Sequence, residues 1–314
     1  MRVAGLTALA LIALALVPLF VHSNYVLSIA ISGFVFVVCA AALNLIYGFV
    51  GLLSFAQLGF WGIGGYAAAI AVVDGKLGFA ASVMFAALLA AVIALVTGFP
   101  ILRTNRHAFV IVTLTFALLC ALVARDWISV TRGPLGIPSL PVPTFFGFAF
   151  ASPTRFYYLA FAFAVLALGI LYALVTSRIG LLLKAIKQNE ALARSQGISP
   201  MPYKLFAFVL GAALTGMAGG IYVFHLRIVD PTFLDFYYMQ TFLIFVVLGG
   251  AGSFWGVVIA GALMVALPEA LRFTNDLRMV IYGFVLVVAM LVMPRGIAGV
   301  FHDRRLNALR AKLA

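Results

Sequence analysis

Long apolar runs alternate with short polar stretches along almost the whole chain. Most runs are about 20 residues long, the length that spans a lipid bilayer as a helix. They cover residues 4–22, 25–47, 51–73, 77–101, 107–124, 156–176, 205–226, 236–249, 253–268 and 279–294. A helix also satisfies its own backbone hydrogen bonds in lipid, and the alternating segments of a membrane barrel are absent from the sequence. The pattern predicts an all-α, polytopic membrane helix bundle of about ten transmembrane helices.

Composition supports this fold class. Hydrophobic residues make up 66% of the 314 residues, charged residues only 9%, and the mean hydropathy is +1.22. Such a chain has too little polar surface to coat a soluble globule.

Two parts of the span pattern allow alternatives. The run 236–249 and the run 253–268 are short and separated by a glycine-rich stretch, so they form either two full crossings or a re-entrant hairpin. The first 22 residues resemble a signal peptide, but the alternation of spans favours a retained anchor.

A polar island at residues 177–204 interrupts the apolar pattern and sets the predicted topology. Its basic residues are Arg178, Lys184, Lys187, Arg194 and Lys204, and its only acidic residue is Glu190. If this island is cytoplasmic, both termini are cytoplasmic too, 295–314 is a basic cytoplasmic tail, and 125–155 is a long extracytoplasmic loop. Most of the 20 lysines and arginines then lie inside, as the positive-inside rule requires. The net charge of +12 is then spread along one membrane face, where anionic lipid attracts it, so it does not require a nucleic-acid partner.

The island itself has the pattern of one short surface helix over residues 184–197. Glu190 stands three residues after Lys187 and four before Arg194, spacings that favour ion pairs on a helix. Leu183, Ile186 and Ala193 can share its apolar face, and Gly197, Pro200 and Pro202 are expected to end it. The alternative is a linker that is basic only because of the topology rule.

A second unusual region is the glycine-rich stretch 43–69, which contains the polar residues Asn44, Ser54 and Gln57. The glycines serve tight helix packing or permit an interrupted helix beside a cavity. A mid-span amide such as Gln57 either bonds a neighbouring helix or faces a hydrated path, so these three residues are candidates for the substrate path. Phe60-Trp61-Gly62 recurs as Phe254-Trp255-Gly256, which is either an internal repeat with interrupted helices in both halves or chance.

Several classes of function are disfavoured by missing motifs. None of the predicted spans contains an Asp or Glu, which argues against an ion-coupled carrier, and the sequence has no phosphate-binding loop. The four histidines lack metal-ligand spacing, Cys39 and Cys120 fit small packing positions, and no nucleophile and base pair stands out. A membrane enzyme is therefore less favoured, and active transport would need a separate motor protein that meets the polar island.

Four stretches together resemble permease subunits of the branched-chain amino-acid ABC importers. They are LNLIYGFVGLLSFAQLGFWGIGGYAAA (43–69), KAIKQNEALARSQGISPMPYKLFAFVLGAALTGMAGGIY (184–222), VVLGGAGSFWGVVIAGAL and the terminal MPRGIAG (293–299). The last of these and the loop TRGPLGIPSLP (131–141) make the chain more similar to the LivM type than to the LivH type. The loop departs from the family pattern at Thr131-Arg132-Gly133-Pro134, where an altered sequence affects docking or the solute accepted.

The resemblance implies a single permease domain over 1–314 in the bacterial inner membrane, with no cofactor of its own. It implies a LivH-type partner subunit, two cytosolic ATPase subunits that hold ATP and magnesium, and an extracytoplasmic solute-binding protein. The ATPases would meet Lys184, Lys187, Glu190, Arg194 and Gly197, and the binding protein would meet Arg125, Asp126, Arg132, Asp230 and Asp235. Related permeases carry urea or other amino acids, so the solute stays open. The main alternative is a stand-alone facilitator or channel.

Overall fold

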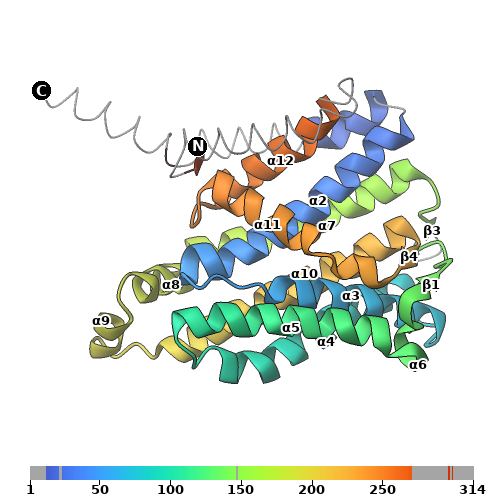
Figure 1. Cartoon of the computed structure of the whole chain (residues 1–314). Helices are drawn as coiled ribbons and strands as arrows, with labels where there is room; N and C mark the ends of the chain where they lie inside the picture. Colours follow the sequence, from blue (N-terminus) through green and yellow to red (C-terminus); the bar gives the residue numbers. More distant parts are fainter. Residues whose placement is uncertain (1–11, 21–22, 146–147, 271–295, 298, 300–314) are drawn as a thin grey trace, which may run out of the picture.

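The computed structural model describes residues 12–20, 23–145, 148–270, 296, 297 and 299 (Figure 1). Its helices are α2 (Asn24–Asn44), η1 (Leu45–Val50), α3 (Ala56–Val73), α4 (Phe79–Ile101), α5 (Arg106–Asp126), α6 (Ile128–Thr131), η2 (Gly133–Leu135), α7 (Pro153–Thr176), α8 (Arg178–Gln188), α9 (Glu190–Ser195), α10 (Pro200–Leu226), η3 (Pro231–Leu234), α11 (Phe236–Gly249) and α12 (Phe254–Ala270). Its strands are β1 (Ile137–Pro138), β2 (Thr144–Phe145), β3 (Phe148–Ala149) and β4 (Ile228–Val229).

The predicted multi-pass helix bundle is confirmed. Within the described residues, 7 helical stretches are long and apolar enough to cross a membrane, and Phe254–Ala266 is a shorter apolar helix. Every apolar run predicted between residues 25 and 268 corresponds to one of these helices. The run 279–294, most of the tail 295–314 and the first part of the run 4–22 lie outside the described residues, although residues 12–20 are helical.

The second and third spans are joined by a break that the run 51–73 did not predict. Helix α2 continues into the π-helix η1, which ends at Gly51 with a left-handed φ of 88°. Residues 51–55 are not helical, and α3 begins only at Ala56. A π-helix and a left-handed glycine both interrupt regular backbone hydrogen bonding. The irregular backbone at Gly51 therefore lies between the second and third spans, and the start of the third span was placed five residues too early.

Helices α3 and α10 are the most buried spans of the described chain. Their most apolar windows are 78% and 72% buried, against 67% for the span Asn24–Val50 and 22% for α5. Small residues permit this close packing, since a side chain at Gly64 would overlap the backbone carbonyl of Gly216. Helices α4 and α5 lie beside this pair and expose large apolar side chains such as Leu88 and Leu118 (Figure 1). The outer spans therefore present the surface suited to lipid.

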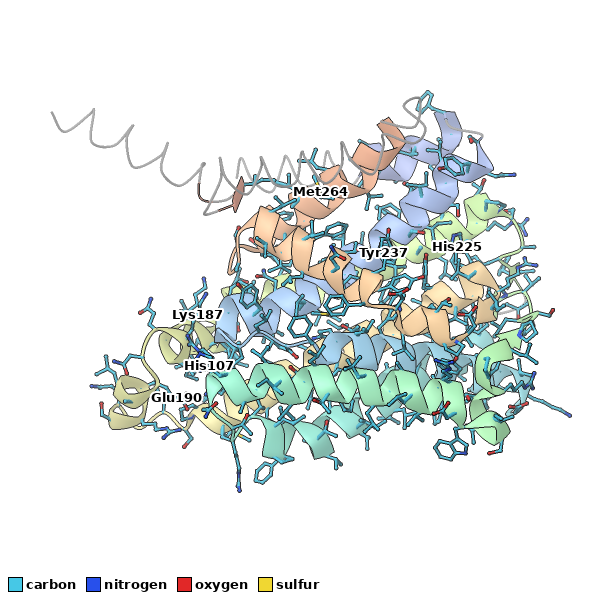
Figure 2. All side chains as sticks on the ribbon, in the orientation of Figure 1. His107, Lys187, Glu190, His225, Tyr237 and Met264 are labelled. Carbon is cyan, nitrogen blue, oxygen red and sulfur yellow. The ribbon has the colours of Figure 1, made fainter. Side chains whose placement is uncertain are left out.

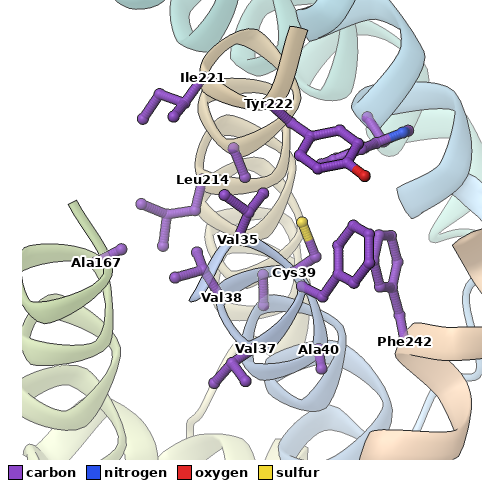
Figure 3. Close-up of a cluster of buried hydrophobic side chains, with 14 of the residues drawn as sticks. Val35, Val37, Val38, Cys39, Ala40, Ala167, Leu214, Ile221, Tyr222 and Phe242 are labelled. Carbon is purple, nitrogen blue, oxygen red and sulfur yellow. The ribbon is translucent and has the colours of Figure 1, made fainter. Parts of the chain in front are cut away.

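A second part of the core joins α2 to α7, α10 and α11 (Figure 3). Val35 and Val38 of α2 pack near Leu214 of α10 and Ala167 of α7, and all four are buried. Cys39 lies in the same cluster with 0% exposure and forms no disulfide. This confirms its expected place as a small packing residue.

At the end of the bundle where α5 finishes, short strands connect the loop 125–155 to the segment after α10. Ile137 of β1 pairs with Val229 of β4 in an antiparallel register, and Leu140 N–H donates to Arg227 O at 3.1 Å. After β4, the helix η3 packs against α3 and α5 before α11 begins. The chain then turns at residues 250–253 and returns as α12, so α11 and α12 form a helical hairpin that also packs on α2.

Candidate coupling and translocation sites

The polar island forms a distinct layer at one end of the bundle. Figure 2 shows Lys187 and Glu190 at this end, near His107 at the start of α5, and His225 far from them toward the opposite end. The island begins as α8 directly after α7, with the Ser177 side chain accepting a hydrogen bond from Ile179 N–H at 3.2 Å. It ends within the first turns of α10, at Lys204.

The island contains two short helices rather than the single helix predicted over 184–197. The break falls at Asn189, whose backbone is extended and whose Oδ1 accepts from Leu192 N–H at 3.0 Å. An asparagine with this geometry is a strong helix N-cap, so it starts α9 instead of continuing α8. The island helix ends before Gly197 as predicted, and Gly197 has a left-handed φ of 80°. Pro200 and Pro202 also occupy the first turn of α10, where proline is tolerated.

The apolar side of the island was predicted correctly. Leu183, Ile186 and Ala193 are all buried, with 5% exposure or less, although they belong to two helices. Their burial fixes both short helices on the bundle.

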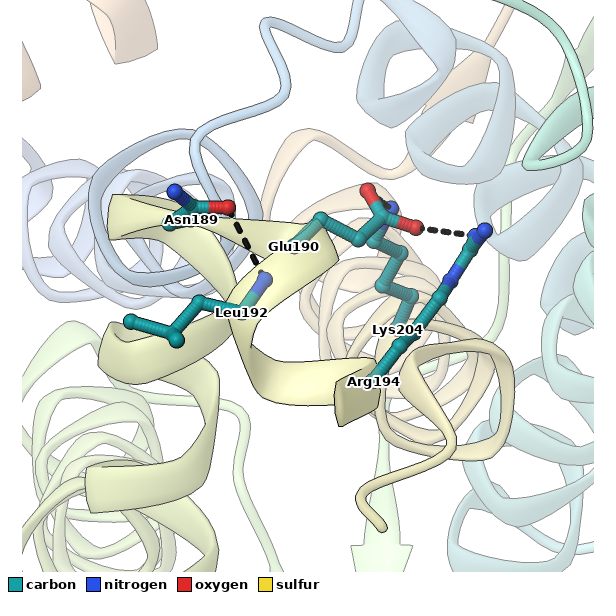
Figure 4. A network of polar contacts seen from close by, with 5 residues as sticks. All are labelled: Asn189, Glu190, Leu192, Arg194 and Lys204. Carbon is teal, nitrogen blue, oxygen red and sulfur yellow. Dashed lines mark hydrogen bonds and ion pairs between the residues drawn. The ribbon is translucent and has the colours of Figure 1, made fainter. Parts of the chain in front are cut away.

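Glu190 links α9 to the start of α10 (Figure 4). Its carboxylate accepts from Arg194 Nη2 at 2.7 Å, the predicted pairing four residues apart, and from Lys204 Nζ at 2.5 Å. Partial burial raises the pKa of Glu190, but the two cations outweigh it and hold the pKa below its ordinary value. A charged Glu190 therefore ties the two helices together at neutral pH.

A groove of about 920 Å³ lies between the α4–α5 turn, α9 and the start of α10. Arg103, Arg194 and Lys204 line it with Glu190, so its charge is predominantly positive. Gly197 also lines it, with a left-handed φ of 80° and open space where a side chain would be. Of the residues predicted for coupling, Glu190, Arg194 and Gly197 are thus brought together at one surface.

The other two predicted coupling residues contact the interrupted second span. The spacing of Lys187 and Glu190 predicted an ion pair between them, and this prediction is wrong. Lys187 Nζ instead donates to Gly48 O of η1 at 2.6 Å. Lys184 Nζ lies 5.2 Å from the centre of the Phe49 ring. Desolvation, followed by the charge of Arg106, lowers the pKa of Lys187. Sequence reasoning missed Gly48, because its partner lies 139 residues away.

Asn44 connects the two glycine-rich breaks of the chain. Its Oδ1 accepts from Gly252 N–H at 2.9 Å and its Nδ2 donates to Ser253 O at 3.1 Å. The side chain therefore holds the turn between α11 and α12 against the end of α2. It is 1% exposed.

Gln57 and Ser54 are fully buried near the start of α3. Gln57 Oε1 accepts from Thr215 Oγ1 of α10 at 2.7 Å, which is the expected bond to a neighbouring helix. Within the described residues, Gln57 Nε2 and Ser54 Oγ have no hydrogen-bond partner. Buried polar atoms are usually hydrogen-bonded, so these two atoms have the capacity to bind a further polar group.

The predicted docking residues are found around the outer loop, but several also stabilise local structure. Arg132 forms an ion pair with Asp74 at 3.1 Å. Asp230 caps η3 by accepting from Thr232 N–H at 2.8 Å, and Asp235 caps α11 at Tyr237 N–H. Arg125 and Asp126 end α5 with exposed side chains.

Comparison with known proteins identifies the family. The family model described as "Branched-chain amino acid transport system / permease component" matches residues 25–290. The high-affinity branched-chain amino acid transport system permease protein LivM of Escherichia coli (strain K12) is 31% identical over 311 residues, covering 92% of this chain and 73% of that protein. LivM of Salmonella typhimurium is 30% identical with the same coverage, and LivH of Escherichia coli (strain K12) is 24% identical over 85% of this chain and 92% of LivH.

No solved structure matches the chain significantly. The higher identity to LivM than to LivH of Escherichia coli (strain K12) agrees with the resemblance seen in the sequence. A permease component is a transport subunit and not itself an enzyme, and its system implies ATPase and binding-protein partners. The chain belongs to the permease family of branched-chain amino-acid ABC transport systems and is a multi-pass protein of the bacterial inner membrane.

Proposed function

We propose that this chain forms half of the translocation path of an ATP-driven importer for branched-chain amino acids or a related small polar solute. A LivH-type permease supplies the other half, as suggested by the weaker similarity of this chain to LivH proteins. The observation that carries the proposal is the polar island: its helix α9 borders a positively charged groove, and its helix α8 contacts the end of the second span. A motor bound at this surface can act on the membrane helices.

The proposed topology has about ten spans with both termini in the cytoplasm. The island 177–204 is then the cytoplasmic coupling loop, 125–155 the outer loop and 295–314 the cytoplasmic tail. The binding protein docks at the outer end, where Arg125, Asp126, Arg132, Asp230 and Asp235 offer charges of both signs that orient a partner.

Coupling to the ATPases is assigned to the polar island. Two cytosolic ATPase subunits, which hold ATP and magnesium, contact Glu190, Arg194 and Gly197 at the groove. Lys184 and Lys187 belong to the same coupling loop and contact η1. Closure of the ATPases then tilts the spans between states open to either side of the membrane.

The path is assigned to the joint where the chain breaks between η1 and α3. Asn44, Ser54 and Gln57 are buried in the present conformation, and the unpaired Ser54 Oγ and Gln57 Nε2 gain partners when the joint opens to solute and water. Interrupted helices at mid-depth supply polar backbone groups that lipid-facing spans do not.

Reconstitution tests this proposal. The chain is placed in proteoliposomes with its LivH-type partner, the two ATPases and the binding protein, and uptake of labelled leucine is measured with and without ATP. We expect accumulation against a gradient only with ATP and all partners, and none with an ATPase variant that cannot hydrolyse ATP. Equilibration of leucine by this chain alone would establish a facilitator and overturn the proposal.

A further inference from the structure

Three interruptions of regular helix meet beside the island. The π-helix η1 ends at Gly51, the turn between α11 and α12 contains Gly250 and Gly252 with φ of 92° and 93°, and α8 ends just before Asn189. Helices α8 and η1 are in contact, as are α2 and the hairpin of α11 and α12. At this meeting point a helix of the island touches the π-helix that ends the second span.

Lys187 spans this meeting point from the α8 side. Its Nζ donates to Gly48 O at 2.6 Å, and its aliphatic stem lies against Gly51, where an added Cβ would come within 2.8 Å of Lys187 Cγ. The last carbonyls of a helix lack intrahelical donors and carry partial negative charge, so a lysine ammonium group there is favoured. Lys184 adds a second contact from the same helix through the Phe49 ring.

The contact continues from Gly48 to the α11–α12 turn. A side chain at Gly48 would overlap both Asn44 Oδ1 and Gly252 N, so no residue but glycine fits between them. Asn44 in turn holds the turn through its bonds to Gly252 N–H and Ser253 O. Lys187, Gly48, Asn44 and Gly252 are in direct contact in this order. A displacement of α8 therefore also moves the turn between α11 and α12.

We propose that Lys187 is the positioning residue that transmits movement of α8 to the interrupted second span and to the α11–α12 turn. This inference rests on the proposed importer function and assigns Lys187 to transmission within the permease instead of to ATPase binding. Glu190 and Arg194 remain the outward-facing contacts. One side of the island thus contacts the ATPase subunits, and the other side contacts the second span.

The test uses the full reconstituted importer and measures leucine imported per ATP hydrolysed. Lys187→Met keeps the aliphatic stem but removes the charged donor, and Lys187→Arg keeps a donor. Arg178→Met, at the exposed first position of α8, is the matched control. We expect Lys187→Met to lower leucine import about tenfold at nearly unchanged ATP hydrolysis, as loss of a charge-assisted hydrogen bond implies. Lys187→Arg restores most of the ratio, and Arg178→Met leaves it unchanged.

A wild-type ratio in Lys187→Met would overturn the assignment, as would loss of ATPase stimulation together with import, because that result indicates a role in ATPase binding. Hydrogen exchange on the unmodified importer gives a second test that needs no variant. Exchange in residues 45–53 should change together with exchange in residues 181–190 when the complex is trapped with a transition-state analogue of ATP. A change in α8 alone would contradict transmission. Lack of ATP-driven import by the unmodified complex would instead contradict the proposed function.

Discussion

The two Phe-Trp-Gly sequences lie in different environments although they share the same three residues. Trp61 in α3 is 0% exposed, stacks on Phe233 with ring centres 4.7 Å apart, and donates from Nε1 to Phe233 O at 3.0 Å. Trp255 in α12 is 37% exposed and has Tyr172 as a neighbour at 5.5 Å. The two tryptophans therefore differ in burial and in hydrogen bonding, although their sequence neighbours are the same.

The glycines of the two sequences nevertheless both permit close packing. A side chain at Gly62 would overlap Leu234 of η3, and one at Gly256 would overlap the Gly249 carbonyl. In each case the missing side chain admits a neighbouring segment. In both halves of the chain, the glycine marks a place where a neighbouring segment packs closely. The burial of the tryptophan shows whether that place lies inside the bundle or at its outer surface.

The largest expected effect concerns the internal pair α3 and α10. Gly64→Ala places a methyl group against the Gly216 backbone, which cannot move aside as a flexible side chain could. We expect destabilisation of about 3 kcal/mol or more, measured as a lower melting temperature by size-exclusion chromatography in detergent. Gly169→Ala in α7 is the control, since its new methyl group meets open space. Equal melting temperatures for the two variants would contradict the internal position of α3.

The second prediction separates the two tryptophans. Trp61→Phe leaves the Phe233 carbonyl without its buried donor and should cost about 1–3 kcal/mol. Trp255→Phe, which removes no hydrogen bond found in the structure, should cost less than about 0.5 kcal/mol. Thermal unfolding of both purified variants measures the difference. Similar losses would show that the two halves are more alike than their burial indicates.

The third prediction separates packing from transport at Gln57. Gln57→Leu and Thr215→Val both remove the bond between the two side chains, so both should reduce stability by about 1 kcal/mol. If Gln57 Nε2 meets solute, only Gln57→Leu also changes the KM for leucine import. Parallel changes in stability and import for both variants would return Gln57 to a packing role.

The smallest expected effect is the pH dependence of Glu190. Because its folded pKa is lowered, its ion pairs stabilise the protein above the unfolded carboxyl pKa of about 4.3 and lose that contribution as the pH falls through the folded value. Glu190 is 37% exposed, and solvent screening keeps the contribution below about 1 kcal/mol. Glu190→Gln should therefore melt slightly lower than the parent at pH 7, and the gap should narrow as the pH is lowered below the unfolded carboxyl pKa. A gap that does not change with pH would exclude these ion pairs as its cause.

Features set by local spacing could be predicted from the sequence. Apolar length gave the spans between residues 25 and 268, and helical spacing gave the Glu190–Arg194 pair and the burial of Leu183. Residues that mark helix boundaries, such as proline, could not be assigned to one boundary from the sequence. Proline both follows a helix end and opens a new helix, so Pro200 was recognised as following α9 but not as the first residue of α10.

The remaining features depend on segments distant in sequence. Lys187 had a nearby carboxylate at favourable helical spacing, but Asn189 ends α8 and directs the lysine to Gly48. Asn44 was expected near the path, yet its bonds to Gly252 and Ser253 could not be inferred because no spacing rule relates residues 208 positions apart. The entry of η3 beside Trp61 was missed for the same reason.

The most direct test of the account asks whether the joint between η1 and α3 opens to water during transport. Ser54→Cys, in a background with Cys39 and Cys120 replaced by alanine, is treated with a membrane-impermeant maleimide in the reconstituted importer. Leu118→Cys on the outside of α5 and Ser129→Cys on the outer loop are the unreactive and reactive controls. The account predicts that Ser54→Cys reacts in one of the nucleotide-free and ATP-trapped states and is protected in the other. Equal reactivity in both states would contradict it.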